Sequence, residues 1–552
     1  MRPLRFSSEL RVWLYPLSWL LGTALTVFVV TVALDTLQPA AFLHVVDLLA
    51  TPNPSSAQNT LSSAGEVVAA VLAIAITVVA IIVELASNRY THRITELFVR
   101  EPINFLVMGF FVVTALQSLW VNLIIDETPG RTGFVPYVSI GVAMGMLTLC
   151  LLILLPYFAY VFEFLNPINI VGRIRDKTLA VLRDGLAEHE VRAAQQEAIR
   201  GLEQLADVSL NAMEHKDKGV SMAGVDAMSA LLLEYQTIRQ RLPEAWFGID
   251  GRLAHNPDFV SMAPEVLEDL ASRRTWLEWK VLRGYQSLYN EALNKMRDIN
   301  YLVAINTRLI GTASFGQDNP ELFTLVIKFF NTYLRSAINA HDIRTAYNVL
   351  NQYRLLAEAA LTEEPAGHRT VEIAKYFKYY GLLSFHAKLP FILETVAYDL
   401  CTLTEYAFDA GSSCTGSLLR ILLQVDKEGE SETQETSLRG VRKAQLKLAS
   451  YFLARGNERL AREVYEDMRD ERPERLASIR DELLSVHSRE FWEVSDRGVN
   501  FDYLTGEEKE MLLSFFEWFG DKLPPVRISM EITPSKIPVP ADAGSHVPPT
   551  RS

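Results

Sequence analysis

The feature that most constrains the fold is an uncharged apolar run from Val67 to Val83, seventeen residues long. A helix rises about 1.5 Å per residue, so this run covers roughly 25 Å, enough to cross the core of a bilayer. Glu84 closes the run, and Arg89, Arg93 and Arg100 follow it. Because arginine concentrates at cytoplasmic helix ends, the run predicts a membrane helix that ends in the cytoplasm.

Three further uncharged runs lie within the first 165 residues, and no comparable run follows them. Together the runs predict a transmembrane domain over residues 1–165, with helices at about 12–34, 67–85, 103–125 and 134–162. The first run follows a basic segment, as a signal peptide does, but it exceeds the roughly 7 to 15 residues of a cleaved apolar region. We therefore expect it to remain as the first membrane helix.

Basic residues are distributed unevenly between the runs. Arginines precede the first run and follow the second, and the segment after the fourth contains Arg173, Arg175, Lys177 and Arg183. The segment from Asp35 to Glu66 has no Lys or Arg. The positive-inside rule then predicts that both termini are cytoplasmic.

The rest of the chain differs from this membrane part. Residues 166–523 show apolar residues at helical intervals and no alternating strand pattern, which predicts a cytoplasmic helical domain. The predicted fold class is therefore all-α: a four-helix transmembrane bundle followed by a repeat-like helical domain. Residues 524–552 are rich in proline and lack periodicity, so we expect a disordered tail.

A local pattern at residues 445–475 resembles one tetratricopeptide-repeat unit. The residues at the spacing of such a unit include Gly456, Ala461, Tyr465 and Pro473. Glycine permits the turn between two helices, alanine permits their close approach, and proline ends the second helix. Stacked units of this kind present a surface to protein partners, whereas a single unit is equally read as an ordinary helical hairpin.

Polar residues in or beside the membrane runs are candidates for a functional role. Gln117 and Asn122 are the most polar groups inside the runs, and they either hydrogen-bond between helices or line a polar path. Glu84 at the end of the second helix either pairs with Arg89 or Arg93 or acts as a gate.

Small residues recur at intervals of four within the spans, a spacing that lets helices approach closely in lipid. They include Gly22, Ala73, Gly141 and Gly145. Two interpretations remain open: helix packing within one protomer, and an oligomer contact or pore wall.

Catalytic motifs are lacking in the sequence. It has no Walker-type phosphate loop, no Gly-x-Ser-x-Gly elbow and no His-Glu-x-x-His pair. Cys150, Cys401 and Cys414 match neither a disulfide framework nor a zinc site. We therefore expect no enzymatic activity, no cofactor and no bound metal.

The second and third runs, with the elbow between them, resemble a family of bacterial predicted membrane proteins, domain of unknown function 2254. Leu85, Ala86, Ser87 and Tyr90 carry the match in the elbow, and the segment from Leu205 to Met228 is similar to the family's post-membrane helix pair. The resemblance covers about residues 1–240. It implies a bacterial inner membrane, and it implies no activity, since the family has none assigned.

Two functions agree with these observations. The first is a membrane-anchored helical platform for protein interaction or signalling, which the repeat-like unit favours. The second is an oligomeric ion channel or transporter gated by the cytoplasmic domain, which the small-residue faces favour. The expected partners are the lipid bilayer and a cytoplasmic protein, with a homo-oligomer left open. The net charge of −13 argues against nucleic acid, which would require a basic surface.

Overall fold

The computed structural model describes residues 8–37, 54–90, 95, 98–99, 101–125, 136–183, 187, 189–249, 251–317, 319–426, 435–491, 497–520 and 523–526. These residues form helices and no strand, which confirms the all-α prediction. The chain divides into two compact units, Met1–Ile174 and Arg175–Ser552. The domain limits expected at residues 165 and 523 stay a prediction, and the proline-rich tail from residue 527 lies outside the described residues.

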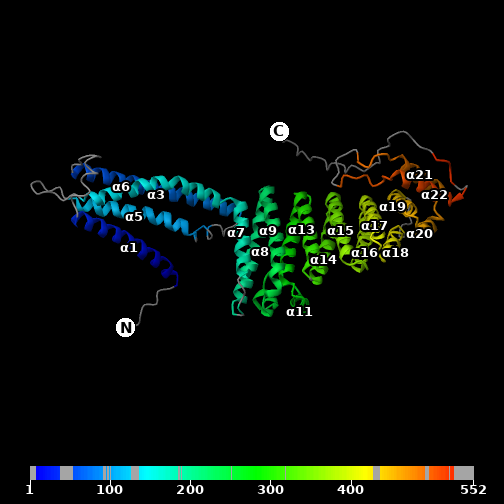
Figure 1. Cartoon of the computed structure of the whole chain (residues 1–552), viewed down its shortest axis with the longest axis horizontal. Helices are drawn as coiled ribbons and strands as arrows, with labels where there is room; N and C mark the ends of the chain where they lie inside the picture. The colour runs from blue at the N-terminus through cyan, green and yellow to red at the C-terminus, as the bar shows by residue number, and fades with distance from the viewer. Residues whose placement is uncertain are drawn as a thin grey trace, which may run out of the picture. The chain divides into compact units, whose positions relative to one another are not determined.

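Within its described part, the first unit consists mainly of α1 (Ser8–Leu37), α3 (Pro54–Arg89), α5 (Pro102–Ile124) and α6 (Tyr137–Phe164) (Figure 1). Proline begins α3 and α5 because the first position of a helix needs no backbone N–H donor. Helices α5 and α6 pack against each other, and each also contacts α1 and α3. This central pair therefore holds the unit together. Helix α7 (Pro167–Arg183) begins in the first unit and continues into the second.

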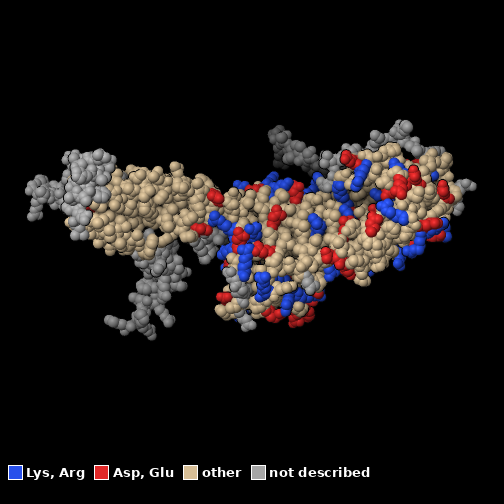
Figure 2. Space-filling model, in the orientation of Figure 1, with Lys and Arg blue, Asp and Glu red and all other residues tan. Residues whose placement is uncertain are grey.

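Three helices among the described residues are long and apolar enough to cross a membrane: Leu61–Arg89, Pro102–Ile124 and Tyr137–Phe164. They confirm three of the four predicted spans. In α1 the apolar stretch is the shorter Leu21–Thr36, because most side chains before it lie outside the described residues. The face of these helices in Figure 2 is almost free of charged side chains. Large apolar side chains such as Leu155, 77% exposed, point outward, as a lipid-facing surface requires.

The second unit is a series of helices, most of them joined by short turns (Figure 1). After α7, the helices of this unit are α8 (Val191–Glu214), α9 (Lys218–Ile238), η1 (Arg239–Arg241), η2 (Glu244–Phe247), α10 (Gly251–Ala254), α11 (Pro264–Ser272), α12 (Trp276–Ala292), α13 (Arg297–Gly316), α14 (Pro320–Asn339), α15 (Ile343–Glu363), α16 (His368–His386), α17 (Pro390–Asp409), α18 (Thr415–Leu422), α19 (Glu435–Ala454), α20 (Glu458–Met468), α21 (Pro473–Ser485) and α22 (Gly506–Glu517).

These helices pack in two rows. In the α9–α22 row, each helix contacts the next in the order α9, α13, α15, α17, α19 and α22. In the α8–α18 row, the order is α8, α12, α14, α16 and α18. Aromatic side chains fill the space between helices, as where Tyr289 stacks on Tyr333 at 4.6 Å and Phe330 on Tyr353 at 4.8 Å between ring centroids. Burying such large rings is the main stabilising contribution available to the unit.

The turns within successive hairpins share a backbone conformation. Asn294, His341 and Lys388 lie 47 residues apart, and all have positive φ angles, of 61°, 54° and 61°. A left-handed residue ends a helix and lets the chain reverse within a few residues. Gly456, with φ of 72°, makes a turn of this kind between α19 and α20. The segment at residues 445–475 is thus a helical hairpin that follows a series of others.

Candidate functional site

The buried face of α5 carries a stripe of polar side chains, which we call the polar stripe: Asn104, Thr114, Gln117 and Ser118, each at most 4% exposed. Gln117 Nε2 donates a hydrogen bond to Thr31 Oγ1 of α1 at 3.3 Å. From α6, Cys150 Sγ donates to Thr114 Oγ1 at 3.5 Å, and Tyr157 Oη donates to Asn104 Oδ1 at 3.2 Å. The polar stripe therefore joins α5 to both α1 and α6.

The two amide side chains predicted as candidates lie on different faces of α5. Gln117 is fully buried, whereas Asn122 is only partly buried, and five residues place them far apart around the helix. Gln117 Oε1 and Asn122 Oδ1 have no hydrogen-bond partner among the described residues. A buried oxygen without a partner costs about 1–3 kcal/mol. Each side chain thus keeps an acceptor that a bound molecule or a water would satisfy.

Asp35, which the sequence did not single out, connects the end of α1 to the start of α6. Its carboxylate is 8% exposed and accepts hydrogen bonds from Val138 N at 2.7 Å and from Ser139 N at 3.0 Å. Ser139 Oγ also donates to it, at 2.6 Å. The carboxylate therefore caps the N-terminus of α6, where free N–H groups and the helix dipole favour negative charge. The sequence signal for this capping role is the position of Asp35 directly after the first uncharged run.

The other predicted membrane residues lie on the outer surface of the unit. Glu84 and Ala73 are exposed on α3. Gly22, Gly141 and Gly145 are exposed too, and a Cβ at any of them would have no neighbour within 4 Å among the described residues. The described residues show no close helix contact at these three glycines. They face the surroundings of the unit, where lipid or another subunit would contact them.

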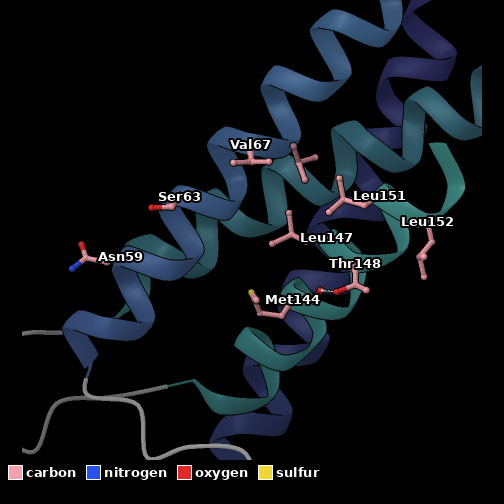
Figure 3. A pocket seen from close by; sticks show the side chains of 9 residues that line it. Asn59, Ser63, Val67, Met144, Leu147, Thr148, Leu151 and Leu152 are labelled. Atoms are coloured by element: carbon pink, nitrogen blue, oxygen red, sulfur yellow. Dashed lines mark hydrogen bonds between the residues drawn. The ribbon is translucent and has the colours of Figure 1, made fainter. Parts of the chain in front are cut away.

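An open groove of about 740 Å³ lies between α3 and α6 (Figure 3). Its lining is apolar or neutral: Asn59, Ser63, Val67 and Val68 from α3, and Met144, Leu147, Thr148, Leu151 and Leu152 from α6. No acidic or basic side chain lines it, so it offers no acid–base chemistry. The apolar lining of this groove suits an apolar ligand chain.

In the second unit, an irregular segment contacts three helices of the α9–α22 row, namely α15, α17 and α19. We call this segment, residues 497–504, the strap. Arg497 Nη1 lies 2.6 Å from Asp399 Oδ1 on α17, and its Nη2 donates to the carbonyl oxygen of Tyr347 on α15 at 2.7 Å. Arg354 Nε also lies 3.3 Å from Asp399 Oδ1. The buried carboxylate thus has one arginine from the row and one from the strap.

The strap makes a second set of contacts four residues further on. The Phe501 ring stacks on Tyr398 of α17 at 4.8 Å, and Lys447 Nζ donates to the Phe501 carbonyl oxygen at 3.1 Å. Asp502 accepts from the Tyr398 hydroxyl and lies 2.8 Å from Lys443 Nζ of α19. Aromatic stacking and a charge pair therefore hold this part of the strap.

Two ionisable groups near the strap, Glu394 and Lys443, have shifted pKa values. Burial raises the pKa of Glu394 on α17 to about 7, helped by the charge of Asp502, although Lys443 opposes the shift. Burial would lower the pKa of Lys443, but the carboxylates of Asp502 and Glu482 raise it instead. With this pKa, Glu394 exchanges a proton near neutral pH.

The predicted repeat residues occupy structural positions. Ala461 is fully buried in α20, Pro473 begins α21, and the Tyr465 hydroxyl donates to the Trp518 carbonyl oxygen at 3.1 Å. Within the described ranges, no three His, Cys, Asp or Glu side chains stand close enough to hold a metal ion. Cys150, Cys401 and Cys414 are free and buried.

These observations define a class: an all-α membrane protein with several apolar helices. Comparison with protein families confirms the predicted resemblance, because residues 9–220 match the family described as "Predicted membrane protein (DUF2254)". The match ends just after the start of α9, so it covers the first unit and the first helices of the second. Neither a curated protein nor a solved structure matches the chain significantly.

Proposed function

We propose that this protein is a membrane-anchored helical platform whose second unit binds a protein partner. The observation that carries the proposal is the pair of helix rows: each helix packs on the next in its row, and turns of the same kind join the rows at successive hairpins. Helical-repeat proteins are built in this way, and they typically bind partners along an extended surface. A binding role without catalysis accords with the membrane unit, whose buried polar groups serve hydrogen bonding between helices.

The placement that we propose follows the distribution of charge. Helix α1 is continuous over 30 residues, about 45 Å, which is long enough for it to serve as a fourth span. With four spans, the positive-inside rule puts both termini and the second unit in the cytoplasm. The matched family, described as predicted membrane proteins, supports a membrane location, and the bacterial inner membrane is part of our proposal.

Ala461→Arg tests the partner-binding role. Ala461 is fully buried in α20, so arginine should separate this helix from α19 and lower the stability of the hairpin by about 2–4 kcal/mol. A photo-crosslinking residue at exposed Tyr379 or Tyr406 of the full chain should capture the same protein in repeated experiments. We expect Ala461→Arg to lose this capture while its membrane insertion is unchanged. Unchanged capture by a variant of unchanged thermal stability would contradict the proposal.

The alternative is an oligomeric channel or transporter gated by the second unit, with the exposed small residues as subunit contacts. The unpartnered oxygens of Gln117 and Asn122 are the observation that favours it. Purified protein in planar bilayers would then give unitary currents that change with Gln117→Ala or Asn122→Ala. Such currents from an oligomer of defined mass would displace the platform proposal.

A further inference from the structure

The strap covers part of the α9–α22 row, one of the two helix rows on which the proposed platform rests. It contacts three successive helices of that row, because Arg497 reaches α15 and α17 and the Phe501–Asp502 pair reaches α17 and α19. The contacts are made largely by side chains. A segment held in this way resembles a bound peptide more than a part of the row itself.

We propose that the strap is an internal ligand in a peptide-binding groove across α15, α17 and α19. The partner that fits this groove carries an arginine, an aromatic residue four positions later and an acidic residue directly after it. This inference rests on the proposed function, and it names the chemistry of the partner segment.

The main argument that a partner segment can replace the strap is that the buried charges of the groove keep an oppositely charged neighbour after the strap leaves. Asp399 is 1% exposed, and without Arg497 it retains Arg354 at 3.3 Å. Lys443 without Asp502 retains Glu482 at 3.3 Å. A buried charge without any partner would cost several kcal/mol, and the row supplies a second partner at both places. Release of the strap therefore leaves neither of these charges uncompensated.

The chain beyond the strap has its own anchor. Thr505 and Glu508 form a capping box at the start of α22. Tyr465 of α20 packs edge-on against Phe515 and Phe519, with ring centroids 6.4 and 4.8 Å apart. Helix α22 can thus stay docked on α19 while the strap exchanges. The tether also keeps the strap near the groove, at an effective concentration of about millimolar.

The test uses the full chain in lipid nanodiscs and a fluorescent peptide with the sequence of residues 497–504, RGVNFDYL. The tethered strap competes with the peptide in the wild type. Replacing Arg497→Ala and Phe501→Ala together should weaken the strap and raise the affinity for the peptide at least tenfold. A control peptide with alanine at the same two positions should not bind either protein.

Each outcome decides the proposal. A folded double variant that binds the peptide no better than the wild type overturns it. A variant that unfolds also overturns it, because the strap would then belong to the folded core. A doubled mass of the wild type that Arg497→Ala abolishes would show that a second copy supplies the segment, which again contradicts a partner peptide. If the peptide test fails but cross-linking still captures a partner, the platform proposal stands and its binding surface lies outside the strap groove.

Discussion

Replacing Glu394→Gln should make the protein more stable at alkaline pH. Its pKa is raised from the ordinary 4.5 to about 7, first by burial and then by the charge of Asp502. A raised pKa means that the folded state binds the proton more tightly than the unfolded state does. Stability from this group is therefore full below pH 4.5 and is lost as the pH rises through about 7. The difference between 4.5 and 7 corresponds to about 3 kcal/mol.

Glutamine cannot ionise, so the variant should avoid this loss. Thermal unfolding of the full chain in nanodiscs, followed by tryptophan fluorescence, measures the effect at several pH values. We expect the free energy of unfolding to exceed that of the wild type by up to about 3 kcal/mol at pH 8.5, and by less than about 1 kcal/mol at pH 5. Glu466→Gln, at an exposed position of α20, is the matched control and should change neither.

The reasoning would be refuted by parallel stability curves for Glu394→Gln and the wild type across this range. It would also be refuted by a variant that is less stable at pH 8.5. Either result would mean that Glu394 is solvated or paired in the folded protein.

Two further substitutions test close contacts. Gly224→Ala should destabilise the second unit by about 1–3 kcal/mol in thermal unfolding, because the added Cβ would overlap Ser209 Oγ and approach the Leu205 carbonyl oxygen to 3.3 Å. Gly219→Ala is the control and should change the stability little, since the nearest neighbour of its Cβ is 3.9 Å away. Asp35→Asn should lower the stability of the first unit by about 1–2 kcal/mol, because it removes the charge that caps α6, and an unchanged melting temperature would exclude that capping role.

The membrane helices were predictable because a long uncharged run is a property of the sequence alone. Bounds of the runs at 103–125 and 134–162 agree closely with Pro102–Ile124 and Tyr137–Phe164. The helix predicted for the second run, at about 67–85, is shorter than α3. Helix α3 begins at Pro54, in a polar segment that a search for apolar runs does not include. Helix start signals such as proline carry that information.

The series of hairpins was not predictable beyond one unit, for a physical reason. Three of its turns are made by left-handed residues, and these are Asn294, His341 and Lys388, three different residue types. Because different residue types adopt this same conformation, the turns share no residue type that a sequence pattern could detect. Only Gly456 gave a recognisable signal, because glycine adopts positive φ without steric cost.

Small-residue spacing alone does not locate the close contacts between helices. Gly141 and Gly145 follow that spacing, yet a Cβ at either has no neighbour within 4 Å in the described part of the chain. Gly201 and Gly224 have no such spacing, yet a Cβ at either would overlap Thr178 or Ser209. Which glycine lies at a contact depends on how helices cross, and crossing is a tertiary property.

The protonation of Glu394 and the occupation of the groove are linked. Asp502 of the strap raises the pKa of Glu394, as Glu482 does, while Lys443 lowers it. Binding that raises a pKa takes up protons, and by reciprocity a lower pH strengthens that binding. The strap, or a partner segment with an acidic residue at the same place, should therefore be held more tightly at pH 6 than at pH 8.5. The peptide assay on the Arg497→Ala and Phe501→Ala double variant, repeated at both pH values, measures this difference in affinity. An affinity that does not change with pH would show that peptide binding is not linked to the protonation of Glu394.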